Sequence, residues 1–183
     1  MKVTANFLAF LAGWWGSVLG AAAGYPWVGP AIVLMVAALH LSIVPRPRRE
    51  LALLLACAGI GLVVDSVMVS LGWVRYDTGV LVEGLAPYWI VAMWIGFATT
   101  LNTCMRWLRD LPLLAAGFGA VGGPLVYWGG SRIGALELSD NAMALIGIGA
   151  VWAAVMPLLY VLARRLDGTR GEDGSIPAHL AAP

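Results

Sequence analysis

Asp65 is the residue of this sequence whose type and surroundings point most clearly to chemistry. It lies inside the apolar run 59–73, within a hydrophobic stretch long enough to cross a membrane. An ionisable side chain at that depth costs roughly 2.5–3.5 kcal/mol on insertion scales, and it usually faces a bundle interior, a partner or a water-filled cavity. Its carboxyl group could bind a ligand, carry a proton or pair with a basic residue. Every other acidic residue is assigned to a loop or to the polar tail.

The residues expected near Asp65 form a candidate ligand or proton site. This site comprises Asp65, Ser66, Tyr127 and Arg132. Arg132 follows the outer end of its apolar segment, and its long side chain can reach back into the membrane. We therefore expect an Asp65–Arg132 ion pair, to which Tyr76 and Tyr127 could add hydrogen bonds. A structural pair that fixes helix register and a true ligand or proton site both remain open.

A second polar group is expected at the opposite, cytoplasmic ends of the segments. It contains Asn6, His40 and Asn102, with Thr103 beside them. Asn and His side chains can form hydrogen bonds between membrane helices that are worth around 0.6 kcal/mol each on average. His40 could instead relay a proton.

The sequence lacks the residue patterns of hydrolytic, metal and redox sites. There is no Ser/His/Asp order, no HExxH and no pair of carboxylates, so hydrolytic catalysis is not predicted. Cys57 and Cys104 form no CxxC or Cys/His cluster, which favours packing roles over a metal or redox site. We expect no cofactor and no metal. A net charge of +1 without a basic stripe also argues against nucleic acid as a partner.

Composition indicates that membrane-spanning helices position these residues. Hydrophobic residues make up 61% of the chain and charged residues 11%, with mean hydropathy +0.85, whereas soluble domains are about 25% charged. About 20 residues span the hydrocarbon core. This rule divides the chain into six apolar segments at 6–24, 27–44, 51–73, 86–105, 111–130 and 142–163. The predicted fold is all-α: a polytopic membrane helix bundle over 1–163, followed by a polar, disordered cytoplasmic tail over 164–183.

The basic residues predict how the bundle is oriented. With both termini inside, nine lysines and arginines fall on the cytoplasmic side and only Arg75 and Arg132 fall outside. An aromatic belt is expected at the outer ends: Tyr25, Trp27, Trp73, Tyr76, Tyr88, Trp89, Tyr127 and Trp128. These patterns predict six spans, N-in and C-in. The alternative, a cleaved signal peptide over 1–23, is disfavoured by the long apolar run that contains Trp14 and Trp15.

Glycine stripes predict close helix packing. The first segment carries Asn6, Ala9, Gly13, Gly16, Gly20 and Gly24 on one face, and the third carries Ala58, Gly61, Asp65 and Gly72. Such stripes let helix backbones approach one another in lipid. The fifth segment combines paired glycines with Pro124, which should kink it. A broken helix can line a cavity or pack tightly, and both remain possible here.

The motifs described above resemble a family of small bacterial inner-membrane proteins known only as a domain of unknown function. The resemblance spans residues 6–163. It rests on Asn6, Gly13-Trp14-Trp15, Val64-Asp65-Ser66, Pro87-Tyr88-Trp89 through Trp94 and Phe97, Thr100-Leu101-Asn102 and, above all, the run 119–135. It implies an integral membrane protein encoded near enzymes that modify membrane fatty acids. Asn102 departs from the family pattern, where a His is expected, which weakens proton chemistry at that position.

The leading functional hypothesis is an accessory, non-catalytic membrane protein that binds a lipid or fatty-acyl amphiphile between its helices. A small proton-coupled permease and a structural subunit that binds other membrane proteins through its glycine stripes are the alternatives. Membrane lipids are the expected partners, and the expected location is the bacterial inner membrane. A lipid binder should have an apolar cleft that opens sideways to the bilayer, whereas a permease should have a polar path.

Overall fold

The computed structural model is helical throughout, apart from one short strand pair, and describes residues 3–140, 142–171, 175–176 and 180. The long helices are α1 (Val3–Ala22), α2 (Val28–Ile43), α3 (Pro47–Ser70), α4 (Tyr88–Leu101), α5 (Pro112–Ile133) and α6 (Ala142–Arg165). A 3-10 turn, η1 (Arg106–Leu108), lies between α4 and α5. The expected all-α fold is thus confirmed, and each helix bound lies within four residues of its predicted position.

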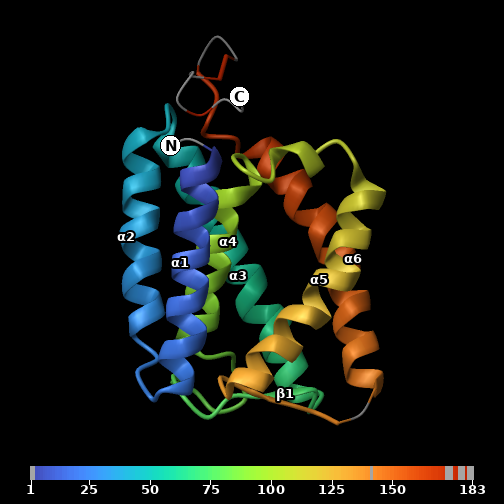
Figure 1. Ribbon diagram of the computed structural model, residues 1–183. Helices are drawn as coiled ribbons and strands as arrows, with labels where there is room; N and C mark the ends of the chain where they lie inside the picture. The colour runs from blue at the N-terminus through green and yellow to red at the C-terminus, as the bar shows by residue number, and fades with distance from the viewer. Residues whose placement is uncertain (1–2, 141, 172–174, 177–179, 181–183) are drawn as a thin grey trace.

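The helices run alternately up and down, so the two ends of the bundle carry different connections (Figure 1). The start of α1 and the end of α6 lie at one end, here named the terminal end. The connections 71–87 and 134–140 lie at the other end, here named the loop end. Each helix therefore passes from one end of the bundle to the other.

Length and composition separate the helices into two groups. Four of them, α1, α3, α5 and α6, are long and apolar enough to cross a membrane, with 20 to 24 residues each. Helices α2 and α4 are apolar but shorter, with 16 and 14 residues. At 1.5 Å per residue, α4 is about 21 Å long, against a hydrocarbon core of about 30 Å. The described helices therefore indicate a membrane protein.

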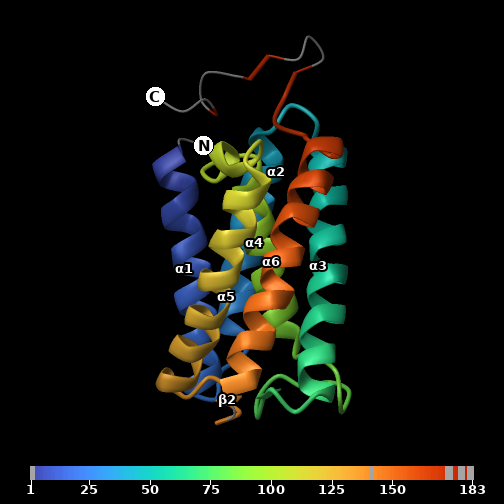
Figure 2. The ribbon, with the colours of Figure 1, turned by 90° about the vertical axis from the view of Figure 1, so that its right-hand side faces the viewer.

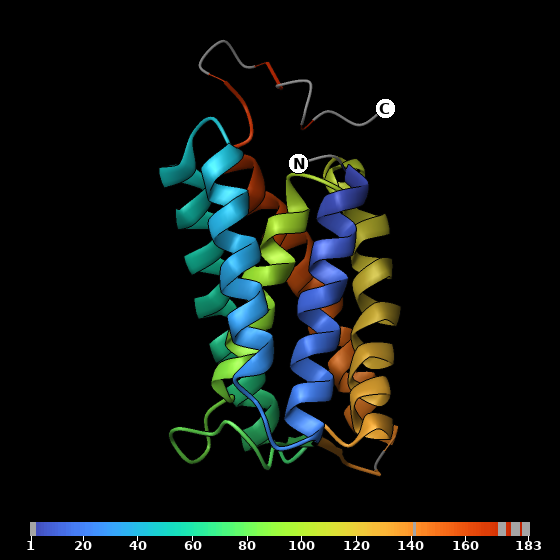
Figure 3. The same cartoon turned by 60° about the vertical axis from the view of Figure 1, so that its left-hand side comes forward.

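The chain packs as two units. Helices α1 to α4 contact one another closely, and α5 and α6 form a separate hairpin whose members cross each other in Figure 1. The hairpin packs less extensively on the other four helices, chiefly through α5 on α1 and through α6 on α3 and α4. Helix α5 appears next to α1 in Figures 2 and 3, and Figure 1 shows that the two helices approach each other at the loop end and diverge toward the terminal end.

The glycine stripes pack helices of this same chain together. A Cβ at Gly13 would lie 2.9 Å from the Val33 side chain, and one at Gly20 would lie 3.2 Å from the Cβ of Val28, so α1 approaches α2 here. At Gly119 a Cβ would collide with the backbone carbonyl of Trp152 in α6. Helix α5 stays helical across Pro124. Gly72 was assigned to the glycine stripe of the third apolar segment but lies beyond the end of α3, with φ +67°.

A two-residue strand pair joins the two units at the loop end. Strand β1 (Val74–Arg75) pairs in antiparallel fashion with β2 (Glu137–Leu138), with Val74 opposite Leu138. Arg75 donates a 2.9 Å hydrogen bond from Nε to Oε2 of Glu137. Both side chains are exposed, and such surface pairs add little stability.

The beginning of the predicted tail is ordered by contacts with the bundle, contrary to the expectation of disorder from residue 164. Helix α6 continues to Arg165. The backbone N–H of Arg46 donates to the Gly168 carbonyl at 3.0 Å, and the Arg46 side chain donates to the carbonyls of Arg170 and Gly171. Asp167 and Thr169 are buried. Most of the rest of the predicted tail lies outside the described residues.

Candidate functional site

The Asp65 carboxyl group is fully buried near the loop end and accepts three hydrogen bonds. Oδ1 accepts from the hydroxyls of Tyr76 at 2.8 Å and Tyr127 at 2.6 Å, and Oδ2 accepts from the Trp94 indole N–H at 2.8 Å. These residues come from α3, the following loop, α4 and α5. The four residues, named the carboxyl cluster, therefore tie the α5–α6 hairpin to the other helices.

The expected Asp65–Arg132 ion pair is wrong. Arg132 is exposed at the end of α5, and among the described residues the hydrogen bonds of Asp65 come from two tyrosines and a tryptophan. Neutral donors from the loop after β1, from α4 and from α5 satisfy the carboxyl group, so no arginine has to fold back along its helix. Ser66 accepts the backbone N–H of Ala86 at 2.9 Å and so holds the loop over the cluster.

A cavity of about 300 Å³ lies between the two units of the bundle. Its wall is formed by α1 and α4 on one side and by α5 and α6 on the other, and it is almost wholly apolar. Two members of the carboxyl cluster, Trp94 and Tyr127, line it. The Trp94 ring stacks on Trp152 of α6, with centroids 4.9 Å apart and planes inclined by 15°.

The cavity opens sideways between α1 and α5. Phe7 of α1 and Phe118 and Val126 of α5 all line it, yet they are 48%, 48% and 42% exposed. Wall residues that are half exposed mark the edge of an opening and not a closed interior. Because these residues lie within α1 and α5 and not in the connections at either end, the opening faces the side of the bundle.

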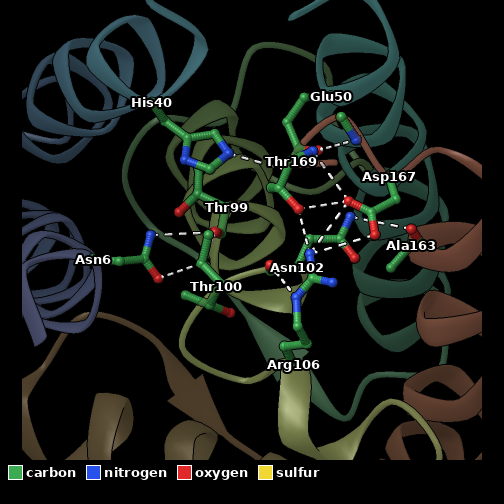
Figure 4. A network of polar contacts seen from close by, with 12 residues as sticks. Asn6, His40, Glu50, Thr99, Thr100, Asn102, Arg106, Ala163, Asp167 and Thr169 are labelled. Carbon is green, nitrogen blue, oxygen red and sulfur yellow. Dashed lines mark hydrogen bonds and ion pairs between the residues drawn. The ribbon is translucent and has the colours of Figure 1, made fainter. Parts of the chain in front are cut away.

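The terminal end holds a buried pair of which only His40 was predicted from the sequence. His40 Nε2 lies 3.0 Å from Glu50 Oε1, and both side chains are fully buried (Figure 4). The other oxygen, Oε2, accepts the backbone N–H of Gly168 at 2.9 Å. Assigning every acidic residue except Asp65 to a loop or tail was therefore wrong for Glu50, which lies in the first turn of α3.

Asp167 anchors the segment that follows α6. Its carboxylate accepts from Arg109 Nη1 at 2.6 Å and pairs with Arg106 at 3.3 Å, and it also accepts the Thr169 hydroxyl at 2.6 Å. Burial raises the pKa of Asp167, but the hydrogen bonds from Thr169 and Arg109 and the charge of Arg106 outweigh it. The net pKa therefore lies below the usual value for an aspartate.

Asn6 and Asn102 serve as links between helices at the terminal end. Asn6 donates from Nδ2 to the Thr99 carbonyl at 3.2 Å and accepts the Thr103 hydroxyl at 2.6 Å. Asn102 donates from Nδ2 to the Ala163 carbonyl at 3.1 Å, which joins α4 to α6. The structure thus brings the predicted residues Asn6, His40 and Asn102 to one end of the bundle but places them in separate hydrogen-bond sets (Figure 4).

Other contributors to these sites were not predicted, and only some carry a signal in the sequence. Trp94 could have been found because Gly61, one turn before Asp65, makes room for a large partner, and its Cβ position falls on the Trp94 ring. Asp167 and Thr169 show the spacing of a local turn, in which the Asp side chain accepts the N–H two residues on. Nothing in the sequence pairs Arg106 and Arg109 with Asp167. Among the described residues, no three His, Cys, Asp or Glu side chains gather as metal ligands.

Comparison with known proteins places the chain in one family. Searches of curated proteins and of solved structures find no match. A family model described as a protein of unknown function (DUF2878) matches residues 3–158, which include all six long helices except the last turns of α6. It also contains the carboxyl cluster and the described residues that line the cavity. The chain therefore belongs to the DUF2878 family of proteins of unknown function.

Proposed function

We propose that this protein holds one alkyl chain of a membrane lipid or fatty-acyl amphiphile in the cavity between its two units. It does so in an accessory, non-catalytic role in membrane lipid modification. The observation that carries the proposal is the apolar cavity with its sideways opening between α1 and α5. Its volume of about 300 Å³ falls at the lower end of the range for small-molecule sites.

The dimensions of the cavity suit a single chain. Its wall on α1 runs from Phe7 to Val18, which is about 17 Å at 1.5 Å per residue. One leaflet contributes half of a hydrocarbon core of about 30 Å. The cavity is therefore about as long as a leaflet is deep, and its volume over that length leaves room for one chain and not for two.

The chemistry of the wall favours an alkyl chain over a proton path. The aromatic rings of Phe10, Trp94, Phe97 and Trp152 contact one another along the wall, and burying apolar surface is favourable in proportion to its area. The carboxyl cluster links α3, α4 and α5, and the Asn102–Ala163 hydrogen bond links α4 to α6 at the terminal end. An alkyl chain would enter through the opening between α1 and α5.

The proposal includes six membrane passages with both termini in the cytoplasm of a bacterial inner membrane. In support, the terminal end carries most of the basic residues, and α2 and α4 run the length of the bundle although they are short. Tyr25, Trp27 and Trp128 are exposed near the loop end, as interfacial residues should be. Reporter fusions after Arg49 and Arg109 should report cytoplasm, and a fusion near Asp77 should report the outer side.

A photo-crosslinking experiment tests the binding proposal. The protein is reconstituted in phosphatidylcholine vesicles with a long-chain alkyl probe that carries a diazirine near its methyl end, and adducts are mapped by mass spectrometry. We expect adducts on α1, α4 and α5 residues that line the cavity. Gly122→Leu should lower the yield several-fold, because Gly122 lines the cavity and a Cβ there meets only the Phe118 ring, at 4.0 Å.

The matched control lies on the same helix. A Cβ at Gly129 meets nothing within 4 Å, so Gly129→Leu adds the same side chain outside the cavity and should leave the yield unchanged. Adducts spread evenly over the exposed faces, with equal yields from Gly122→Leu and wild type, would refute the proposal.

A further inference from the structure

The cavity wall contains a buried hydrogen-bond donor that the chain leaves unsatisfied. Nε1 of Trp152 is buried and has no hydrogen-bond partner among the described residues, although the ring lines the cavity. The Tyr127 hydroxyl is a polar neighbour of this ring in the cavity wall. A buried donor without an acceptor costs about 1–3 kcal/mol, so an oxygen supplied by the occupant of the cavity would relieve that cost.

The Tyr127 hydroxyl offers the complementary acceptor. It lines the same cavity and donates a 2.6 Å hydrogen bond to Asp65 Oδ1. A hydroxyl oxygen keeps two acceptor lone pairs after it has donated. The buried carboxyl group therefore fixes the direction of the Tyr127 O–H, which leaves its oxygen able only to accept from the cavity side.

A donor beside an acceptor matches an alcohol better than other polar groups. An alcohol oxygen can accept a hydrogen bond from Trp152 while its O–H donates one to the Tyr127 oxygen. A carbonyl oxygen can accept from Trp152 but has nothing to donate to Tyr127. A carboxylate or phosphate would bring a negative charge next to the Asp65 carboxyl group, and none of the described residues that line the cavity is basic. Placing such an uncompensated charge in an apolar cavity is costly.

From this wall we infer that the preferred occupant of the cavity is a neutral long-chain alcohol, whose hydroxyl accepts from Trp152 Nε1 and donates to the Tyr127 oxygen. This inference rests on the proposed function, since it names the class of amphiphile that the same cavity takes. It assigns Trp152 as the residue that determines the specificity for a hydroxyl, and it makes Asp65 a positioning residue that acts through Tyr127.

Competition against the diazirine probe tests the inference. The competitors are 1-tetradecanol, tetradecane and tetradecanoate at neutral pH, compared by their mole fraction in the vesicle. For the wild type, 1-tetradecanol should compete about tenfold better than tetradecane, which is the worth of roughly one to two neutral hydrogen bonds. Tetradecanoate should compete no better than tetradecane.

Two variants separate the hydrogen bond from the packing of the ring. Trp152→Phe keeps an aromatic ring but removes the N–H, so the advantage of the alcohol should fall to a few-fold or less while tetradecane competes as before. Trp14→Phe is the control, because Trp14 also lines the cavity but its N–H is not among the buried unsatisfied groups. It should keep the tenfold advantage.

The outcomes distinguish this inference from the function on which it rests. Equal competition by tetradecane and 1-tetradecanol in the wild type would overturn the inference and leave the alkyl site intact. An unchanged advantage in Trp152→Phe, or strong competition by tetradecanoate, would also overturn it. If no competitor displaced the probe and Gly122→Leu had no effect, the proposed function itself would fail.

Discussion

At the scale of single residues, Asp65 shows how neutral partners can hold a carboxyl group inside an apolar bundle. The sequence identified the buried group and its two tyrosine donors, but it favoured Arg132 as the main partner because charge complementarity is the simplest rule for a membrane carboxylate. Trp94 takes that place beside Tyr76 and Tyr127, and each of the three donates one hydrogen bond. Which donors reach Asp65 depends on which helices pack against α3, and the pattern of one sequence does not specify that.

The arrangement around Asp65 predicts a graded loss of stability. Asp65→Leu leaves three buried donors unsatisfied and should lower the free energy of unfolding by about 2 kcal/mol or more. Asp65→Asn keeps one acceptor oxygen, which suits Trp94, and should cost less. Thermal unfolding of the purified variants in detergent measures both.

Arg132→Gln provides the control, because Arg132 is exposed. It should change stability by less than about 0.5 kcal/mol, and its effect should add to that of Asp65→Asn. Strong coupling between the two positions would restore the ion pair that the structure rejects.

At the scale of elements, hydropathy predicted all six helices but placed some of their ends wrongly. Helix α3 begins at Pro47 and not at residue 51, because Pro47 occupies the first turn, where its missing N–H costs nothing. Arg48, Arg49 and Glu50 follow Pro47 and are charged, so the hydropathy rule began the apolar segment only at residue 51. The aromatic belt was only partly right, since Trp89, Tyr76 and Tyr127 are buried in the bundle. Position near the end of a segment does not by itself separate a belt residue from an aromatic core residue.

The crossing of α5 and α6 predicts which glycines tolerate a side chain. Gly119→Leu should destabilise the protein by at least about 1–3 kcal/mol, since its Cβ would collide with the backbone of α6 at Trp152. Gly129→Leu should be close to neutral because its Cβ meets open space. Comparing detergent unfolding temperatures of the two variants checks the prediction; equal temperatures would contradict the crossing.

At the scale of the whole molecule, the two units and the segment that follows α6 could not be predicted. Composition marked residues after 164 as polar and rich in glycine, which is typical of disorder. Asp167 and Gly168 nevertheless pack on Arg106, Arg109 and Glu50, which lie about 60 and 120 residues earlier in the chain. Contacts of that sequence separation leave no periodic signal.

The buried Asp167 predicts how stability depends on pH. Its pKa is lowered in the folded protein, so it contributes stability that is fully present above the unfolded value of about 3.9. That contribution is lost as the pH falls through the lower folded value. Unfolding temperatures in detergent between neutral pH and pH 3 should therefore fall more steeply for wild type than for Asp167→Asn. Parallel curves would show that the carboxylate does not carry this dependence.

The division of the cavity wall between two units has a consequence for biosynthesis. Helices α1 to α4 leave the ribosome first, and Asp65 can meet Tyr76 and Trp94 as soon as α4 has been synthesised. Tyr127 and Trp152 arrive only with the last two helices, and Asp167 follows them. Since chains fold from the N-terminus during synthesis, the cavity forms only when the chain is nearly complete. A polypeptide interrupted before α6 would expose its apolar wall to lipid and lack the site.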